Sequence, residues 1–259
     1  YHEYGYFPGC VDFMDVEVKF THLNKGDADH ASIAAASIKL LNYAEIDPLI
    51  LDMNVFKCSG HDQLWQGNLE VYDALKEHNM RRLKESGIKI LTCSCAECYR
   101  TFAVDYDLPN ILGIKVEHIT QTLQGRGLKF KAPENVTVSY HDPCRLGRMM
   151  GEYEAPRDLI QLVDGATMVE LENNKERALC CGVSSMMYCN DATKAVRRKR
   201  LDQGTDAGID LMLGGCPKCY MHMQCMLNEE RMNPEDGHHH DYEMMDLMQF
   251  LVACLEDGK

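Results

Sequence analysis

Five cysteines in the second half of the chain are spaced like ligands of a metal cluster. An isolated cysteine is followed, after 35 residues, by an adjacent pair, and 34 residues beyond that pair by a Cys-x-x-Cys turn. The five are Cys144, Cys180, Cys181, Cys216 and Cys219. Adjacent side chains diverge, so one small ion cannot bind both members of the pair comfortably. A [4Fe–4S] cubane uses four thiolates, one per iron, so the fifth needs a chemical reason.

With Gly182 after the pair, this string resembles the CCG domain of heterodisulfide reductase catalytic subunits and their relatives. The resemblance, which covers nearly the whole chain, implies that the fifth thiolate bridges irons in an opened, noncubane [4Fe–4S] cluster. It also implies a catalytic role for Cys181, because an opened cluster leaves an iron able to take an external sulfur. The implied reaction is the reduction of a disulfide to two thiols.

A second cysteine set in the first half lacks one member. Its proposed ligands are Cys10, Cys58, Cys95 and Cys98. Ser59 stands where the second half has Cys181, and four thiolates suit an ordinary [4Fe–4S] or a smaller cluster. Residues 58–62 and 95–98 look closest to the membrane-linked type of heterodisulfide reductase subunit and to the related subunit of sulfate-reducer membrane complexes.

Disulfide reduction also needs protons for the product thiolates. The candidate donors beside the cysteines are His61, His141 and Lys218, with Glu97 and His222 as weaker candidates. A histidine can supply a proton near neutral pH. Each of these side chains can also be interpreted as a surface group or as support for a cysteine ligand.

The other cysteines and a histidine run have structural interpretations. Cys189, Cys225 and Cys254 fall in expected helices and are predicted to pack in the core, as is Cys93. The three histidines at 238–240 follow a polar segment, which predicts a solvated loop rather than a metal site.

Alternating strands and helices must position the cysteines. Expected strands lie near residues 4–10, 48–53, 88–91, 114–117, 136–140, 167–171 and 209–213, and expected helices near 29–43, 66–85, 156–163, 190–203 and 241–255. This order predicts an α/β fold with mainly parallel sheets. In such sheets, ligands gather on loops at the carboxyl ends of the strands, which is where all nine proposed cysteines fall.

Matching spacings indicate an internal duplication. From Cys58 to Cys180 is 122 residues, and the two Cys-x-x-Cys turns are 121 residues apart. The chain is therefore predicted to form two similar halves, residues 1–128 and 129–259. Each is expected to be a small, mainly parallel sheet with flanking helices, joined by a linker near residues 125–133.

Composition disfavours several classes of partner. The net charge of −13 makes nucleic acid and anionic membranes poor partners, and no apolar run approaches the roughly 20 residues that span a bilayer. Thirteen cysteines without a visible secretion signal favour metal ligation over disulfides. A cytoplasmic location is expected, including the cytoplasmic face of a membrane complex reached through partners.

Three functions compete. The first is reduction of a small-molecule or protein disulfide, with electrons from an iron–sulfur, flavin or haem subunit, since no nucleotide-binding fingerprint is visible. The second is electron relay, as in the related subunits of glycolate- and lactate-oxidising complexes. The third is a zinc-stabilised binding module. The Cys180-Cys181 pair favours the first, because a relay cluster gains nothing obvious from a fifth ligand.

Overall fold

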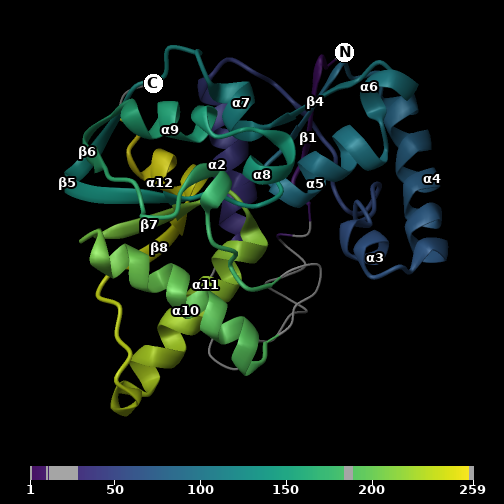
Figure 1. Ribbon diagram of the computed structural model, residues 1–259. Helices are drawn as coiled ribbons and strands as arrows, with labels where there is room; N and C mark the ends of the chain where they lie inside the picture. The colour runs from purple at the N-terminus through teal and green to yellow at the C-terminus, as the bar shows by residue number, and fades with distance from the viewer. Residues whose placement is uncertain (1, 10, 12–28, 184–188, 257–259) are drawn as a thin grey trace.

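Two four-stranded parallel sheets form the framework (Figure 1). The computed structural model describes residues 2–9, 11, 29–183 and 189–256. The first sheet has the order β2-β1-β3-β4 and the second the order β6-β5-β7-β8. The strands are β1 (Tyr4–Phe7), β2 (Leu49–Ile50), β3 (Ile90–Cys93), β4 (Lys115–His118), β5 (Phe130–His141), β6 (Val163–Met168), β7 (Leu211–Gly214) and β8 (Glu243–Asp246). The repeated strand order confirms the predicted duplicated α/β fold. The exact boundary between the halves, after residue 128, stays a proposal.

Corresponding helices cover the two sheets. In the first half they are α2 (His30–Tyr43), α3 (His61–Trp65), α4 (Leu69–Ser86), α5 (Ala96–Arg100), α6 (Leu108–Ile111) and α7 (Ile119–Leu123). In the second they are α8 (Gly147–Met150), α9 (Glu154–Gln161), α10 (Asp191–Asp206), α11 (Pro217–Met232) and α12 (Leu247–Ala253). Both α7 and α12 follow the last strand of their sheet directly and begin with a capping box, on His118 and Asp246. Among the described residues, no helix is long and apolar enough to cross a membrane.

The halves share their core. One hydrophobic cluster joins Phe7 and Leu91 of the first half to Met212 of the second, and the other joins Leu40 to Leu251. Helix α2 packs against α12, where the Gln249 amide donates to the Asp29 carbonyl at 2.9 Å (Figure 1). Because each cluster takes residues from both halves, the two sheets are held in one fixed arrangement.

Several predicted boundaries were wrong. The helix expected at 66–85 is preceded by α3 and starts at Leu69, because Gly67 adopts a φ of +80° and ends the earlier turn. The strand expected at 167–171 lies at 163–168. The final expected helix, 241–255, is a strand followed by a helix: β8 is partly buried beside β7, and Asp246 then caps α12 by accepting from the Met248 amide at 2.9 Å.

Two assignments outside the cysteine motifs also need correction. Cys189 is exposed and precedes α10, whose N-cap is Asn190, so it is not a core residue; Cys93, Cys225 and Cys254 are buried as predicted. The histidine run is a surface loop only in part. His240 is buried, and its two ring nitrogens contact Glu230 at 2.6 Å and Asp202 at 3.1 Å.

Candidate metal centres

Eight of the nine proposed ligands lie in the described residues, and Cys10 lies outside them. Each Cys-x-x-Cys turn occupies the start of a helix that follows a central strand. Cys95 and Cys216 are the N-caps of α5 and α11, so the second cysteine of each turn lies in the first helical turn. The strand-end placement expected for these cysteines is the one observed.

The five cysteines of the second half line one cavity. The sulfurs of Cys181 and Cys219 are 3.1 Å apart, and hydrogen-bond contacts also join Cys144 to Cys180 and Cys216 to Cys219. The contact with Cys180, together with burial, raises the pKa of Cys181 to about 12. No disulfide forms among the described cysteines. Five thiols gathered in a buried space suit a metal cluster, because bound metal ions deprotonate thiols and compensate part of their negative charge.

The first-half cavity repeats this arrangement with one substitution. It is lined by Cys58, Ser59, Cys95 and Cys98. The Ser59 hydroxyl donates to the Cys98 sulfur at 3.5 Å. Ser59 and Cys98 correspond to Cys181 and Cys219, whose sulfurs are in contact in the second half. A hydroxyl therefore replaces the fifth thiol without altering the turn.

The two turns also share a glycine conformation. Gly60 and Gly182 have φ values of +78° and +79°, and each amide lies 3.4 Å from the sulfur two residues earlier, on Cys58 and Cys180. A Cβ at Gly182 would lie 2.4 Å from the Thr193 carbonyl oxygen. Helix α10 therefore packs directly onto the cysteine pair.

The two cavities share two lining residues. Glu97 and Lys218 line both of them. These residues hold the same position in the two Cys-x-x-Cys turns, and their side chains form an ion pair at 2.8 Å. Lys218 also binds both carboxylate oxygens of Asp62, at 2.6 and 2.7 Å. Beside this pair, the thiols of Cys95 and Cys216 are in hydrogen-bond contact.

Of the predicted proton donors, His61 lies beside this junction. In His61, Nε2 accepts from Arg145 at 3.3 Å and Nδ1 lies 3.1 Å from the Thr101 hydroxyl. Burial, Lys218 and Arg145 lower the pKa of His61 to about 3. His61 is therefore a neutral hydrogen-bonding group at pH 7.

His141 is held by a similar contact. Its Nδ1 accepts from Arg200 at 3.0 Å, which leaves the proton on Nε2. A ring nitrogen lies within 4.8 Å of the sulfurs of Cys181 and Cys219. Burial and Arg200 lower the pKa of His141 to about 3.

Lys218 is held differently. Burial lowers the pKa of Lys218, but the neighbouring carboxylates of Glu97 and Asp62 raise it above its usual value. Among the three predicted donors, Lys218 alone stays charged at neutral pH. The catalytic roles of all three stay predictions.

Sequence reasoning missed several residues at the site. Asp62 and Trp65 follow the first glycine turn, and the Arg145 guanidinium lies 4.0 Å over the Trp65 ring. Arg197 donates to the Cys181 carbonyl at 3.1 Å. The signals were available in the sequence: Arg145 directly follows Cys144, and α10 carries arginines one turn apart just after the cysteine pair.

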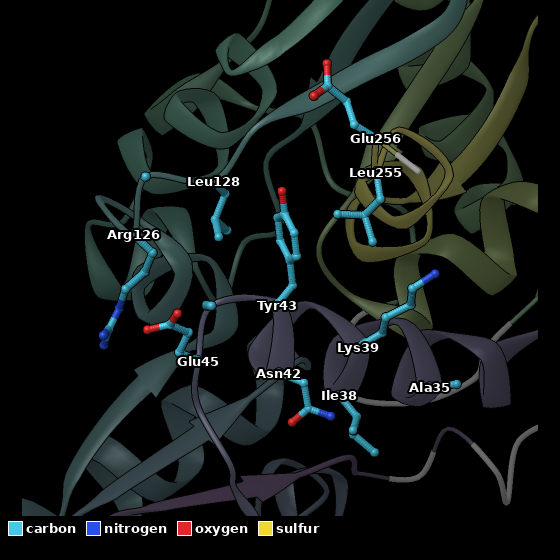
Figure 2. Close-up of a pocket in the computed structure, with 12 residues that line it drawn as sticks. Ala35, Ile38, Lys39, Asn42, Tyr43, Glu45, Arg126, Leu128, Leu255 and Glu256 are labelled. Carbon is cyan, nitrogen blue, oxygen red and sulfur yellow. The ribbon is translucent and has the colours of Figure 1, made fainter. Parts of the chain in front are cut away.

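A larger cavity of about 1010 Å³ lies away from the cysteines (Figure 2). It is lined by the end of α2, the segment before β5 and the residues after α12, and Figure 2 shows Tyr43 pointing into it from α2. It contains no cysteine and no candidate proton donor. It is not part of the cysteine site.

Together, the repeated sheets and the cysteine turns at their strand ends define a duplicated, cysteine-rich metal-binding protein. The family model for the cysteine-rich domain CCG matches residues 4–103 and 138–224, which include all nine proposed ligands. The chain therefore belongs to this family and carries two copies of its domain, as the spacing of the cysteines predicted.

Curated relatives support the same family. One of the subunits of the dihydromethanophenazine:CoB–CoM heterodisulfide reductase of Methanosarcina barkeri is 31% identical over 78% of this chain and 52% of its own length. The EtfAB:quinone oxidoreductase of Syntrophomonas wolfei is 27% identical over 84% of this chain and 30% of its own length. This chain thus spans about half the length of the first relative. Both of these relatives are oxidoreductases.

Among solved structures, a putative Asp/Glu racemase from Yersinia pestis is similar over 98% of this chain and 96% of its own, with 10% identity and a TM-score of 0.38.

Proposed function

We propose that this chain is an iron–sulfur oxidoreductase module that reduces a disulfide at its second-half centre. The observation that carries the proposal is the difference between two otherwise matched contacts: Cys181 meets Cys219 where Ser59 meets Cys98. The duplicated fold, the glycine turns and the Cys-x-x-Cys turns are the same on both sides. The extra thiol therefore marks a difference in chemistry between the centres rather than a difference in fold.

The residues fit two iron–sulfur clusters. The second-half cysteines Cys144, Cys180, Cys181, Cys216 and Cys219 would hold a noncubane [4Fe–4S] cluster. The first-half cysteines Cys10, Cys58, Cys95 and Cys98 would hold a [4Fe–4S] or smaller cluster. Such clusters supply one-electron chemistry, and the open one supplies an iron that can accept a sulfur.

The overall reaction is R–S–S–R′ + 2 e⁻ + 2 H⁺ → RSH + R′SH. Lys218 lines both cavities and carries a proton at neutral pH. Its ion pairs with Glu97 and Asp62 fix its ammonium between the two side chains. After Lys218 donates a proton, these carboxylates are the groups through which a proton would return to it. His141 carries its proton on Nε2, and one of its ring nitrogens lies within 4.8 Å of the Cys181 and Cys219 sulfurs. His61 supports Arg145 beside Cys144.

The first-half centre is the proposed entry point for electrons. The Cys95–Cys216 contact brings ligands of the two centres together, so electrons cross a very short gap. Electrons come from an iron–sulfur, flavin or haem subunit, consistent with relatives that are subunits of larger enzymes. The substrate is a small-molecule or protein disulfide, and the proposed location is the cytoplasm, including the cytoplasmic face of a membrane complex.

A second candidate function is electron relay alone. The shared lining of the two cavities and the Cys95–Cys216 contact favour it, because two neighbouring centres form a path whether or not the second performs chemistry. The relative from Syntrophomonas wolfei is named for a quinone rather than for a disulfide. The two candidates differ in what Cys181 does.

The test is Cys181→Ser, which makes the second centre match the first. With four thiolates left, the variant should fold, bind iron and take electrons from a chemical reductant, but reduce disulfides slowly or not at all. The exposed Cys189, changed to Ser, is the control and should stay near the wild-type rate. Wild-type disulfide turnover by Cys181→Ser would refute the open-cluster mechanism and leave electron relay in its place.

A further inference from the structure

Three buried arginines surround the second-half cysteines. Arg145 is 8% exposed, Arg197 is 1% exposed and Arg200 is 0% exposed. Arg145 follows Cys144 in the chain. Arg197 and Arg200 lie one turn apart on α10, the helix that Gly182 allows to pack against the cysteine pair. The fold therefore places three buried arginines next to one centre, and Arg145 lines its cavity.

Each arginine contacts a ligand or a group beside one. Nη1 of Arg145 lies 3.9 Å from the Cys144 sulfur. Nε of Arg197 donates to the Cys181 carbonyl. Nε of Arg200 donates to His141, whose ring lies within 4.8 Å of two ligand sulfurs. Nη2 of Arg200 is buried and has no hydrogen-bond partner among the described residues.

None of the three forms an ion pair with a carboxylate among the described residues. Arg157, also buried, shows the contrast: it binds Asp142 at 2.7 and 2.9 Å and Glu170 at 2.7 and 3.0 Å. Asp142 is thus already engaged. Burial lowers the pKa of Arg200 to about 10, although the nearby Asp142 opposes this shift. Unpaired buried charges are strongly destabilising, so these arginines need an anion.

We propose that Arg145, Arg197 and Arg200 are the counter-charges of an anionic iron–sulfur cluster at the second-half centre, and that they hold its reduction potential above that of the first-half cluster. The inference rests on the proposed function for the presence of the clusters. The five-thiolate centre carries one more thiolate than the first, and it receives the arginines. Of the charged side chains that line the two cavities, Glu97 and Lys218 line both, Asp62 lines only the first-half cavity and Arg145 lines only the second-half cavity.

This arrangement sets the direction of electron transfer. A positive environment favours the reduced, more negative form of a cluster. One electron then leaves the first-half cluster as the second-half cluster gains one, and a second transfer completes the pair that a disulfide consumes.

The test uses charge-removing and charge-keeping substitutions in the full chain. Arg197→Met and Arg200→Met should each shift the potential of the second-half cluster to more negative values by at least about 59 mV, a tenfold change in the one-electron equilibrium. Arg197→Lys and Arg200→Lys should retain most of the potential. The first-half potential should stay unchanged. Potentials are read by redox titration followed by electron paramagnetic resonance.

Stability gives a second readout. Loading the cluster should raise Tm by a smaller amount in the Met variants than in wild type, because the cluster then neutralises fewer unpaired buried arginines. The control is Arg157→Met, which should lower Tm equally with and without the cluster and leave both potentials unchanged.

Two outcomes would overturn the inference: an unchanged potential in the Arg197→Met/Arg200→Met double variant, or an equal shift in Arg157→Met. Neither readout needs a disulfide. Shifted potentials without disulfide turnover would refute the reductase proposal and support this one. Zinc as the only bound metal would refute both.

Discussion

The ion pair between Lys218 and Glu97 is predicted to be a major link between the halves. Replacing Lys218 with Met removes the ammonium and leaves Glu97 buried and Asp62 without its partner. Breaking a buried pair by removing one member costs about 3–5 kcal/mol. The Lys218 and Glu97 side chains are 4% and 11% exposed, but Asp62 is 35% exposed and partly solvated. We therefore expect a loss at the lower end, about 3 kcal/mol.

Urea denaturation of the anaerobically loaded protein measures this loss. A matched control is Lys194→Met, since Lys194 pairs with Glu229 at 2.5 Å but both side chains are about a quarter exposed. That control should lose less than about 1 kcal/mol. In the Lys218→Met/Glu97→Gln double variant, the losses should be less than additive by about 1 kcal/mol or more. If Lys218→Met cost no more than Lys194→Met, or if the double variant were additive, the pair would not stabilise the junction.

Three further predictions concern pH, iron and backbone shape. Burial lowers the pKa of His118 to about 4, below the unfolded value of about 6.5, so the unfolded state binds the proton and stability falls as pH drops below 6.5. In denaturation experiments, the loss of stability between pH 7 and pH 5 should be about 2 kcal/mol smaller for His118→Asn, which keeps a capping side chain, than for wild type. Changing Cys95 and Cys98 to Ala should remove about half of the iron found by elemental analysis, if each centre holds four irons; loss of all iron would contradict two separate centres. Gly182→Ala should destabilise the protein by more than about 2 kcal/mol and release iron from the second centre, because its Cβ meets the Thr193 carbonyl. Gly208→Ala, with a φ of +63° and no atom within 4 Å, should cost only about 1–2 kcal/mol.

The sequence predicted the fold well where periodic signals were local. The matching strand and Cys-x-x-Cys spacings around Cys95 and Cys216 led to two equivalent parallel sheets, and both turns start helices after central strands. The last strand was missed because Glu243–Asp246 has no distinct apolar run; it becomes a strand only through pairing with β7, a contact distant in sequence.

The cysteine sets were predictable, but their surroundings were not. Spacing identifies Cys181 and Ser59 as equivalent, and the structure shows that they make equivalent contacts. No spacing predicts that Lys218 pairs with Asp62, which is 156 residues away. Likewise, the neutral state of His61 follows from burial and from Arg145, both of which depend on tertiary packing.

The pairing of equivalent positions 97 and 218 bears on how such a chain could arise from a symmetric ancestor. In a dimer of identical units, a two-fold axis through this contact would place a residue against its own copy, so two acids or two bases would meet. In a single chain the two positions are free to differ, and here they are Glu97 and Lys218. The halves are then complementary but not interchangeable. Two first halves would repel each other at this contact, because two acids would meet. A first half therefore pairs better with a second half, which protects the tandem protein against assembly in the wrong combination.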